Sequence, residues 1–254
     1  SAPCASMAEQ VLRDFDMNSL PAGFSLNSDT SGFYHPPEHK DNRPAKYGLG
    51  SSAAVCTATY CALADFVGRD RQLDEAMASH RAFQHGKGSG LDVAASWHGG
   101  VIRFQNGHVQ PQAWPDSLHW QAVWTGNSAA TDTALGHFAR WQTEADTAPL
   151  HALVEASALL CDAPSMDNLA GYTQTLGQLD RAAKLNIFTP AHQRLATIAH
   201  AHHLIYKPCG AGGGDIGIAV GEDRSAVQQF CSQAAAANYV PLNLEIAPHG
   251  VEKA

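Results

Sequence analysis

Two glycines and two hydroxyl side chains precede an apolar segment between Lys46 and Val55, in the order Lys-Tyr-Gly-Leu-Gly-Ser-Ser-Ala-Ala-Val. If a helix starts at Ser51, the backbone N–H groups of this loop point at an anion, and the helix dipole adds partial positive charge behind them. The arrangement is typical of a site for the phosphates of a nucleotide. It is not a Walker loop, because the lysine precedes the glycines and no Gly-Lys-Ser/Thr follows. A plain turn before a helix is the alternative.

A second glycine-rich loop, Gly210–Gly214, lies between apolar segments and ends on Asp215. Three of its glycines are consecutive, which costs backbone entropy and is expected where the backbone must approach another group closely. A tight crossover between a helix and a strand is the alternative. A third loop, Gly86–Gly90, precedes another short apolar segment. The presence of both loops in one chain strengthens the functional interpretation of each.

Composition places the chain among globular enzymes. It has 254 residues, of which 44% are apolar and 16% charged. Its net charge of −8 argues against a nucleic-acid or anionic-membrane surface. No apolar run is long enough to span a bilayer, and no signal peptide opens the chain. The six cysteines form no CxxC pair, so we expect free thiols in the cytoplasm.

Hydrophobic periodicity predicts the elements that position these loops. A helix over 51–66 follows the first loop, and Val55, Ala58, Ala62 and Phe66 fall on one of its faces. Further helices are expected at 5–15, 73–83, 92–96, within 131–202 and at 225–237, and strands at 24–28, 101–104, 119–124, 216–220 and 239–246. Strands mixed with long helices predict an α/β or α+β fold.

Several motifs resemble those of one enzyme family, in the family's order. Gly48–Ala54 resembles the second signature of the GHMP kinases, which include galactokinase, homoserine kinase and mevalonate kinase. Lys207–Asp215 resembles the third signature. Gly88–Ser96 and the turn Trp124–Gly126 are similar to the phosphomevalonate kinases within that family. The likeness runs from about residue 24 to residue 249.

The resemblance implies a two-domain kinase fold that binds ATP and Mg²⁺ in a cleft. The ATP-binding N-terminal domain would be 1–113 and the C-terminal domain 114–254. The implied reaction transfers the γ-phosphoryl group of ATP to 5-phosphomevalonate, a step of isoprenoid precursor synthesis. The alternatives are another GHMP kinase, a related decarboxylase, and a catalytically silent ligand-binding homologue.

The resemblance also assigns roles to residues. The ATP phosphates would lie against Gly48, Leu49, Gly50, Ser51, Ser52 and Ala53. Ser52 would contact Mg²⁺ or phosphate, whereas Ser51 is better placed to cap the helix. Asp92 would lie beside the acceptor oxygen and orient groups or bind metal, because an ionised phosphate acceptor needs no strong base. The expected substrate contacts are Lys87, Ser89, Lys207, Cys209, Gly210, Ala211, Gly212, Gly213 and Asp215. His80 and Arg81 are further candidates, and Lys46 is a weaker one.

Two departures from the family pattern bear on activity. Cys209 stands where phosphomevalonate kinases commonly have serine, and a thiol is a poorer hydrogen-bond donor than a hydroxyl. The first signature, a Pro-Gly-Lys strand and turn followed by Gly-Glu, is missing, so we expect an N-terminal domain that lacks its first strands. The chain would then be a fragment, a natural short form or an inactive homologue. Because an open sheet edge must be covered, we expect self-association, a partner chain that completes the N-terminal sheet, or an edge rebuilt by the N-terminal segment.

Overall fold

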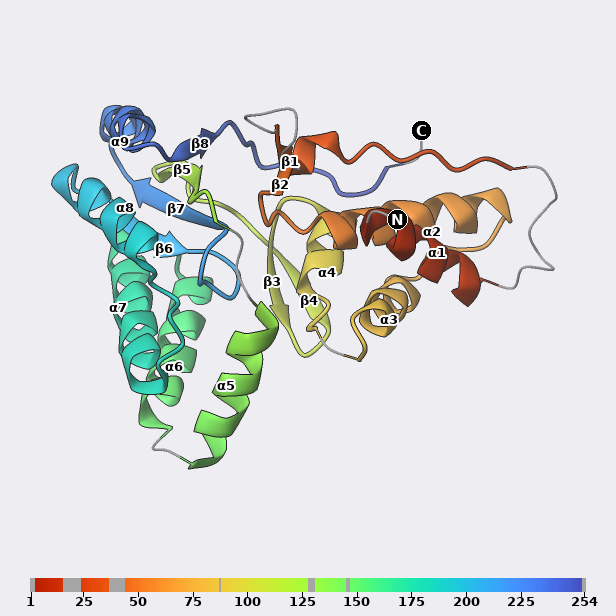
Figure 1. The fold of residues 1–254 in the computed structure, drawn as a ribbon, viewed down its shortest axis with the longest axis horizontal. Coiled ribbons are helices and arrows are strands. Elements are labelled where there is room, and N and C mark those ends of the chain that lie inside the picture. Colours follow the sequence, from red (N-terminus) through yellow and green to blue (C-terminus); the bar gives the residue numbers. More distant parts are fainter. Residues whose placement is uncertain are drawn as a thin grey trace. The chain divides into compact units, whose positions relative to one another are not determined.

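The computed structural model describes residues 3–15, 24–36, 44–86, 88–127, 131–144 and 147–252. It divides into two compact units, whose elements are labelled in Figure 1. Unit 1 consists of Ser1–Tyr34, Leu49–Ala113 and Glu245–Ala254, and unit 2 of His35–Gly48 and Trp114–Leu244. The division falls inside the first glycine loop, between Gly48 and Leu49. The mixture of helices and strands confirms the predicted fold class, and the domain bounds of 1–113 and 114–254 stay a prediction.

Unit 1 is mainly helical. Its elements are α1 (Pro3–Asp14), the 3₁₀ helix η2 (Ser31–Phe33), α2 (Ser51–Phe66), α3 (Leu73–Phe83), α4 (Leu91–His98), β3 (Val101–Gln105) and β4 (His108–Gln112). Helix α2 contacts α1, α3 and α4 (Figure 1), and its Tyr60 and Leu63 side chains are buried in the core of this unit. Two short paired strands, β1 (Tyr34–His35) and β2 (Ala45–Lys46), lie in the segment before the first glycine loop.

The face of α2 that periodicity singled out is not the one that packs into the core. Val55 is buried, but Ala58, Ala62 and Phe66 are exposed, Phe66 by 51%. Most other positions of α2 are buried as well, so the helix is apolar on nearly all sides. A helix without a polar face gives periodicity no means of choosing the buried side.

The strands of unit 1 differ from the prediction in two places. Residues 24–30 form no strand, although the sequence predicted one over 24–28. Strand propensity forms no ladder without a partner strand, and the Phe24 ring instead packs on Phe66 at 5.7 Å between centroids. Strand β4 was missed, although Asn106 and Gly107, with φ of 50° and 81°, form the two-residue turn that an Asn-Gly pair signals.

Unit 2 is a four-stranded antiparallel sheet between helices (Figure 1). Its strands are β5 (His119–Trp124), β6 (Ile205–Pro208), β7 (Ile216–Gly221) and β8 (Val240–Leu242), in the order β6-β7-β5-β8. Its helices are α5 (Thr131–Glu144), α6 (Ala148–Asp162), α7 (Met166–Ala183), α8 (Pro190–Ala201) and α9 (Arg224–Ala236). Side chains alternate between the two faces of the sheet. Tyr206 and Ala219 therefore pack against α8 and α9, whereas Ile205 and Ile218 pack on the side of α6 and α7.

The sequence predictions for unit 2 hold except at the edges of the sheet. Helix α9 and strands β5 and β7 lie where they were expected, and helices fill the region 131–202. The last strand covers only Val240–Leu242 rather than 239–246, because it pairs with just three residues of β5. Strand β6 was not predicted.

The structure adds two observations about the chain as a whole. Within the described ranges, none of the helices combines the length and apolar character needed to cross a bilayer. The cysteines whose side chains are described, Cys56, Cys61, Cys161, Cys209 and Cys231, are free thiols.

Candidate active site

The first glycine loop leads into a helix that no side chain caps. Gly50 is the N-cap of α2, with a left-handed φ of 74°, and the first bond along the helix runs from Ala54 N–H to the Gly50 carbonyl at 3.1 Å. The preceding amides in the first turn have no acceptor within the helix. Ser51 is the first helical residue rather than the cap, and its buried Oγ has no partner among the described residues. The start of α2 thus presents hydrogen-bonding groups suited to an anion.

His80 on α3 holds the hydroxyl of Ser52. The Ser52 Oγ lies 3.2 Å from Nε2 of His80, whose side chain is only 4% exposed. A substrate contact, for which His80 was a candidate, would require an exposed side chain. His80 is instead buried behind Ser52. The pairing fixes the direction of the hydroxyl that the family resemblance assigns to metal or phosphate.

Asp92 lies beside the start of α2. Helix α4 begins after Gly90, which is its N-cap, so Asp92 sits in the first turn and does not cap the helix through its side chain. A Cβ atom built on Gly50 would stand 3.7 Å from the Asp92 Cγ, and the Asp92 side chain is exposed. Ser89 accepts a hydrogen bond from the Leu91 N–H at 3.2 Å. Unit 1 thus brings an exposed carboxylate to the uncapped helix start.

The basic residues expected to contact the substrate belong to segments other than α2. Lys87 lies outside the described residues. Arg81 is exposed in the last turn of α3. In unit 2, Lys207 Nζ lies 4.0 Å from Cys209 Sγ and 5.9 Å from the centre of the Tyr172 ring. This contact puts a positive charge next to the Gly210–Gly214 loop.

In unit 2, the segment before the first glycine loop is anchored on the sheet. Tyr47 packs edge-on against Trp124 of β5 at 5.5 Å between ring centroids, and its hydroxyl lies 3.2 Å from Nδ1 of His35. The next residue, Gly48, has a φ of 81° and lies against Asp215. A Cβ on Gly48 would stand 2.6 Å from Asp215 Oδ2, closer than van der Waals contact allows. Gly48 is therefore required by both its backbone conformation and its neighbour.

Backbone hydrogen bonds hold the Gly210–Gly214 loop at both ends, and before it Cys209 N–H donates to the Ile216 carbonyl at 2.9 Å. Asp215 N–H donates to the Asn127 carbonyl at 2.7 Å, and Thr125 N–H donates to the Asp215 carbonyl at 2.9 Å. In the middle, Gly213 N–H donates to the Ile187 carbonyl at 3.1 Å. A Cβ on the neighbouring Gly212 would stand 2.8 Å from the Ile187 Cα, so the loop lies directly on the 187–188 segment.

A buried histidine supports the loop from behind. His192 on α8 is fully buried, with Nε2 3.0 Å from the Gly214 carbonyl and Nδ1 2.9 Å from the Tyr206 hydroxyl. A carbonyl can only accept, so Nε2 carries the proton, and Tyr206 donates to Nδ1 of a neutral ring. Burial lowers the pKa of His192 and raises the pKa of Tyr206, which keeps both groups uncharged. Sequence reasoning missed this pair, since His192 is one of several polar residues of α8 and nothing along the chain identifies Tyr206 as its partner.

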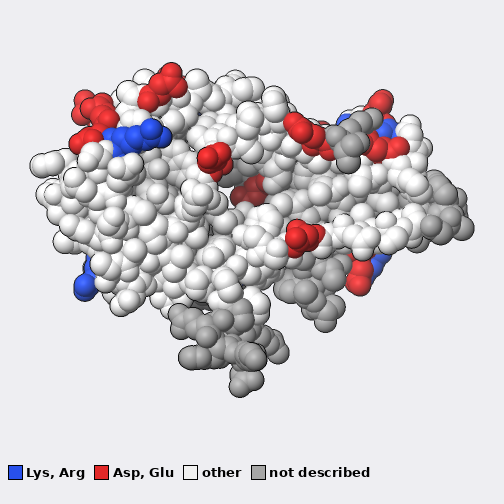
Figure 2. Space-filling model, turned by 90° about the horizontal axis from the view of Figure 1, so that it is seen from above, with Lys and Arg blue, Asp and Glu red and all other residues white. Residues whose placement is uncertain are grey.

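Charged side chains are sparse on the face of the molecule drawn in Figure 2. The face in Figure 2 carries dispersed acidic side chains and a few basic ones rather than one basic patch, in keeping with the net charge of −8. In the described ranges, no cluster of three or more His, Cys, Asp or Glu side chains could hold a metal ion. A divalent cation at the helix start would therefore need oxygens from a bound ligand as well as from the chain.

Comparison with known proteins identifies the class. Residues 7–100 match the family described as GHMP kinases N terminal domain. This segment of the chain is a GHMP kinase N-terminal domain. Among curated proteins, phosphomevalonate kinase of Streptomyces sp. (strain CL190) is 33% identical, in a match that covers 72% of this chain and 58% of that protein. The chain thus spans less than two thirds of the length of this relative.

Solved structures show the same fold. The Lin0012 protein of Listeria innocua superposes with a TM-score of 0.74 at 20% identity, covering 97% of this chain and 77% of that one. Streptococcus pneumoniae phosphomevalonate kinase in complex with phosphomevalonate and AMPPNP superposes with a TM-score of 0.69 at 17% identity, covering 97% and 82%. At these identities the likeness establishes the fold.

Proposed function

We propose that the chain transfers the γ-phosphoryl group of ATP to the phosphate of 5-phosphomevalonate, giving 5-diphosphomevalonate and ADP. The observation that carries the proposal is the uncapped start of α2 with the exposed Asp92 carboxylate beside Gly50. The substrate follows the name of the Streptomyces relative, and the Streptococcus structure holds phosphomevalonate with an ATP analogue.

In the proposed reaction, an oxygen of the acceptor phosphate forms a bond to the γ-phosphorus while the bond from that phosphorus to the β-phosphate oxygen breaks. ADP leaves with the electron pair. The amides at the start of α2 and the Ser51 hydroxyl would bind the ATP phosphates, since that buried oxygen has no other partner among the described residues. Mg²⁺, when bound, neutralises charge on the β- and γ-phosphates. Ser52 and Asp92 are the oxygen donors of unit 1 suited to hold it.

In unit 2, the Gly210–Gly214 loop would line the acceptor phosphate. Its support by Ile187 and His192 keeps the backbone in one conformation, and Lys207 supplies positive charge beside it. Lys87 and Arg81 stay candidates for the anionic substrate. Cys209 would contribute a weaker hydrogen bond than the serine of the family pattern.

An assay of ADP release tests the proposal. We expect turnover with phosphomevalonate and none with mevalonate, homoserine or galactose. Asp92→Asn should lower kcat on the order of 10²-fold, whereas the exposed Asp116→Asn, a matched control, should leave it unchanged. Absence of turnover with every acceptor would refute the kinase proposal. Binding of AMPPNP in the same samples would then favour the silent ligand-binding homologue.

We also propose that the chain self-associates, or takes up a partner chain, through the exposed face of α2. Its support is Phe66, which is 51% exposed next to the exposed Ala58 and Ala62. An exposed aromatic ring beside small apolar side chains on one helix face favours burial in an interface. Sedimentation should show a dimer or larger species that Phe66→Glu dissociates. A monomer at micromolar concentration would contradict self-association.

We also propose a cytoplasmic location, which the free thiols support because the cytoplasm keeps thiols reduced.

A further inference from the structure

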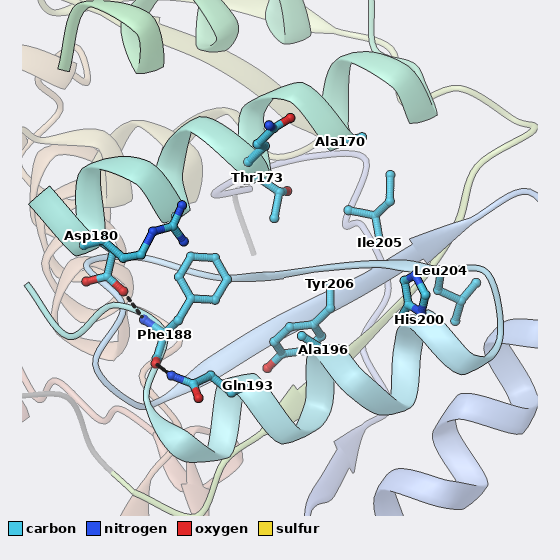
Figure 3. A pocket seen from close by; sticks show the side chains of 13 residues that line it. Ala170, Thr173, Asp180, Phe188, Gln193, Ala196, His200, Leu204, Ile205 and Tyr206 are labelled. Carbon is cyan, nitrogen blue, oxygen red and sulfur yellow. Dashed lines mark hydrogen bonds between the residues drawn. The ribbon is translucent and has the colours of Figure 1, made fainter. Parts of the chain in front are cut away.

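A groove runs along the open edge of the sheet in unit 2. It has a volume of about 630 Å³ and lies beside the edge strand β6, between α7 and α8 (Figure 3). Apolar side chains line it, including Phe188 from the segment between α7 and α8, Leu204 directly before β6, and Ile205 and Tyr206 of β6. Its size falls within the range of small-molecule sites. None of the residues that line it belongs to the phosphate site proposed above.

One stripe of α7 brings a hydroxyl and a guanidinium group to the groove, and Gln193 and His200 of α8 add polar groups on the opposite side. Thr173, Gly177 and Arg181 are spaced four residues apart and therefore share a face of the helix. The position of a Cβ on Gly177 lies 3.5 Å from Arg181 Nη1 and 4.0 Å from the Phe188 ring, so the glycine leaves room for both side chains. Arg181 takes part in no ion pair among the described residues. The nearby Asp180 carboxylate is occupied by the backbone amides of 187 and 188, each at 2.9 Å.

The groove also contains a polar atom without a partner. The Thr173 Oγ1 is buried and makes no hydrogen bond within the described part of the chain. In Figure 3 the Thr173 side chain extends from α7 toward the space over Phe188 and Tyr206. Threonine in a helix populates two χ1 rotamers, so its hydroxyl can turn to form a hydrogen bond with a polar group of a ligand. A buried polar group gains stability when it is given a partner.

We propose that this groove is a second ligand site, for a small amphipathic anion. The apolar body of the ligand lies against Phe188, Leu204 and Ile205, and its carboxylate, phosphate or sulfonate pairs with Arg181. A guanidinium group beside an aromatic ring is suited to hold such a head group.

The walls of the groove are bonded to the Gly210–Gly214 loop by two routes. Tyr206 donates to His192, which donates to the Gly214 carbonyl. Phe188 follows Ile187, whose carbonyl accepts the Gly213 N–H. A ligand that moves either wall therefore shifts the loop, which makes the groove a regulatory site for whatever the loop binds.

Binding is tested with 1-anilinonaphthalene-8-sulfonate and with N-phenyl-1-naphthylamine, which has the same rings without the sulfonate. Both should bind the wild-type chain saturably, as their fluorescence reports. Arg181→Gln should weaken the sulfonate about tenfold and leave the neutral probe unchanged. Arg224→Gln, which removes an exposed arginine of α9, is the matched control and should change neither.

Two variants that fill the groove test whether both probes bind there. Ala170→Trp adds bulk at an exposed position of α7 and Ala196→Phe at a half-buried position of α8, so at least the first leaves the core intact. Each folded variant, checked by circular dichroism, should lose both probes at least tenfold. Unchanged probe binding in a folded filled variant would overturn the site.

Coupling to the loop is read by NMR of ¹⁵N-glycine-labelled protein. The probe should shift the amide signals of Gly213 and Gly214 but not that of Gly107, in the hairpin turn of unit 1. Probe binding without these shifts would refute the coupling. Neither readout depends on turnover, so failure here is separate from failure of the proposed kinase activity.

Discussion

Replacing Gly48 by alanine should damage unit 2 through one identifiable contact. The substitution places a Cβ 2.6 Å from both Cβ and Oδ2 of Asp215, at a backbone φ of 81°. Adopting the left-handed conformation costs a non-glycine residue about 1–2 kcal/mol. Overpacking adds about 1–3 kcal/mol. Gly48→Ala should therefore lower the free energy of unfolding by about 2–5 kcal/mol.

A double-mutant cycle separates these two contributions. Asp215→Gly removes the side chain that the new Cβ would meet, at a residue whose own φ of 53° suits glycine. In that background Gly48→Ala should cost only the conformational part, about 1–2 kcal/mol. The interaction energy between the two substitutions should be about 1–3 kcal/mol, measured by urea unfolding of all four proteins.

Two controls sharpen the cycle. Gly107→Ala changes a glycine with the same φ of 81° but with no atom within 4 Å of its Cβ position, so it reports the conformational cost alone. AMPPNP affinity should fall in Gly48→Ala and recover partly in the double variant, because the loop regains its position. If Gly48→Ala destabilises no more than Gly107→Ala, and the cycle shows no interaction energy, the close approach of Gly48 to Asp215 is refuted.

Three further predictions concern groups behind the site. His80→Asn should weaken AMPPNP binding severalfold by freeing the Ser52 hydroxyl, and unchanged affinity would contradict the positioning role. Burial lowers the pKa of His192 below the ordinary histidine pKa of about 6.5. At a pH below about 6.5 the unfolded chain therefore binds a proton that the folded chain does not, and the free energy of unfolding decreases as the pH decreases. His192→Gln should therefore lose less melting temperature than the wild type between about pH 7 and pH 5, and equal slopes would refute the burial argument. Burial raises the pKa of Cys56 to about 12 and of Cys61 to about 11, so neither should react with a disulfide reagent at neutral pH until urea unfolds the chain.

Local chemistry was sufficient to predict the elements around the site. Glycines before an apolar run placed the start of α2 at Ser51. The prediction left the helices within 131–202 undivided, although Thr189 and Pro190 are usual signals for the start of α8. The strand at 24–28 could not be judged locally, because a strand needs a partner that the sequence does not name. The Asn-Gly turn at 106–107 was a usable signal for β4 that the prediction did not apply.

The sequence by itself determined where the glycine-rich loops lie, that helix α2 begins after the first of them, and which enzyme family their motifs resemble. Glycine conformations and helix starts depend on residues a few positions apart, so they can be read along the chain. Only the tertiary structure decided that Asp92 lies beside Gly50, that His80 holds Ser52 and that His192 holds Gly214. These contacts join residues that are 22 to 42 positions apart in the sequence. Their distances follow from how helices pack, a property of the whole core that no local pattern encodes.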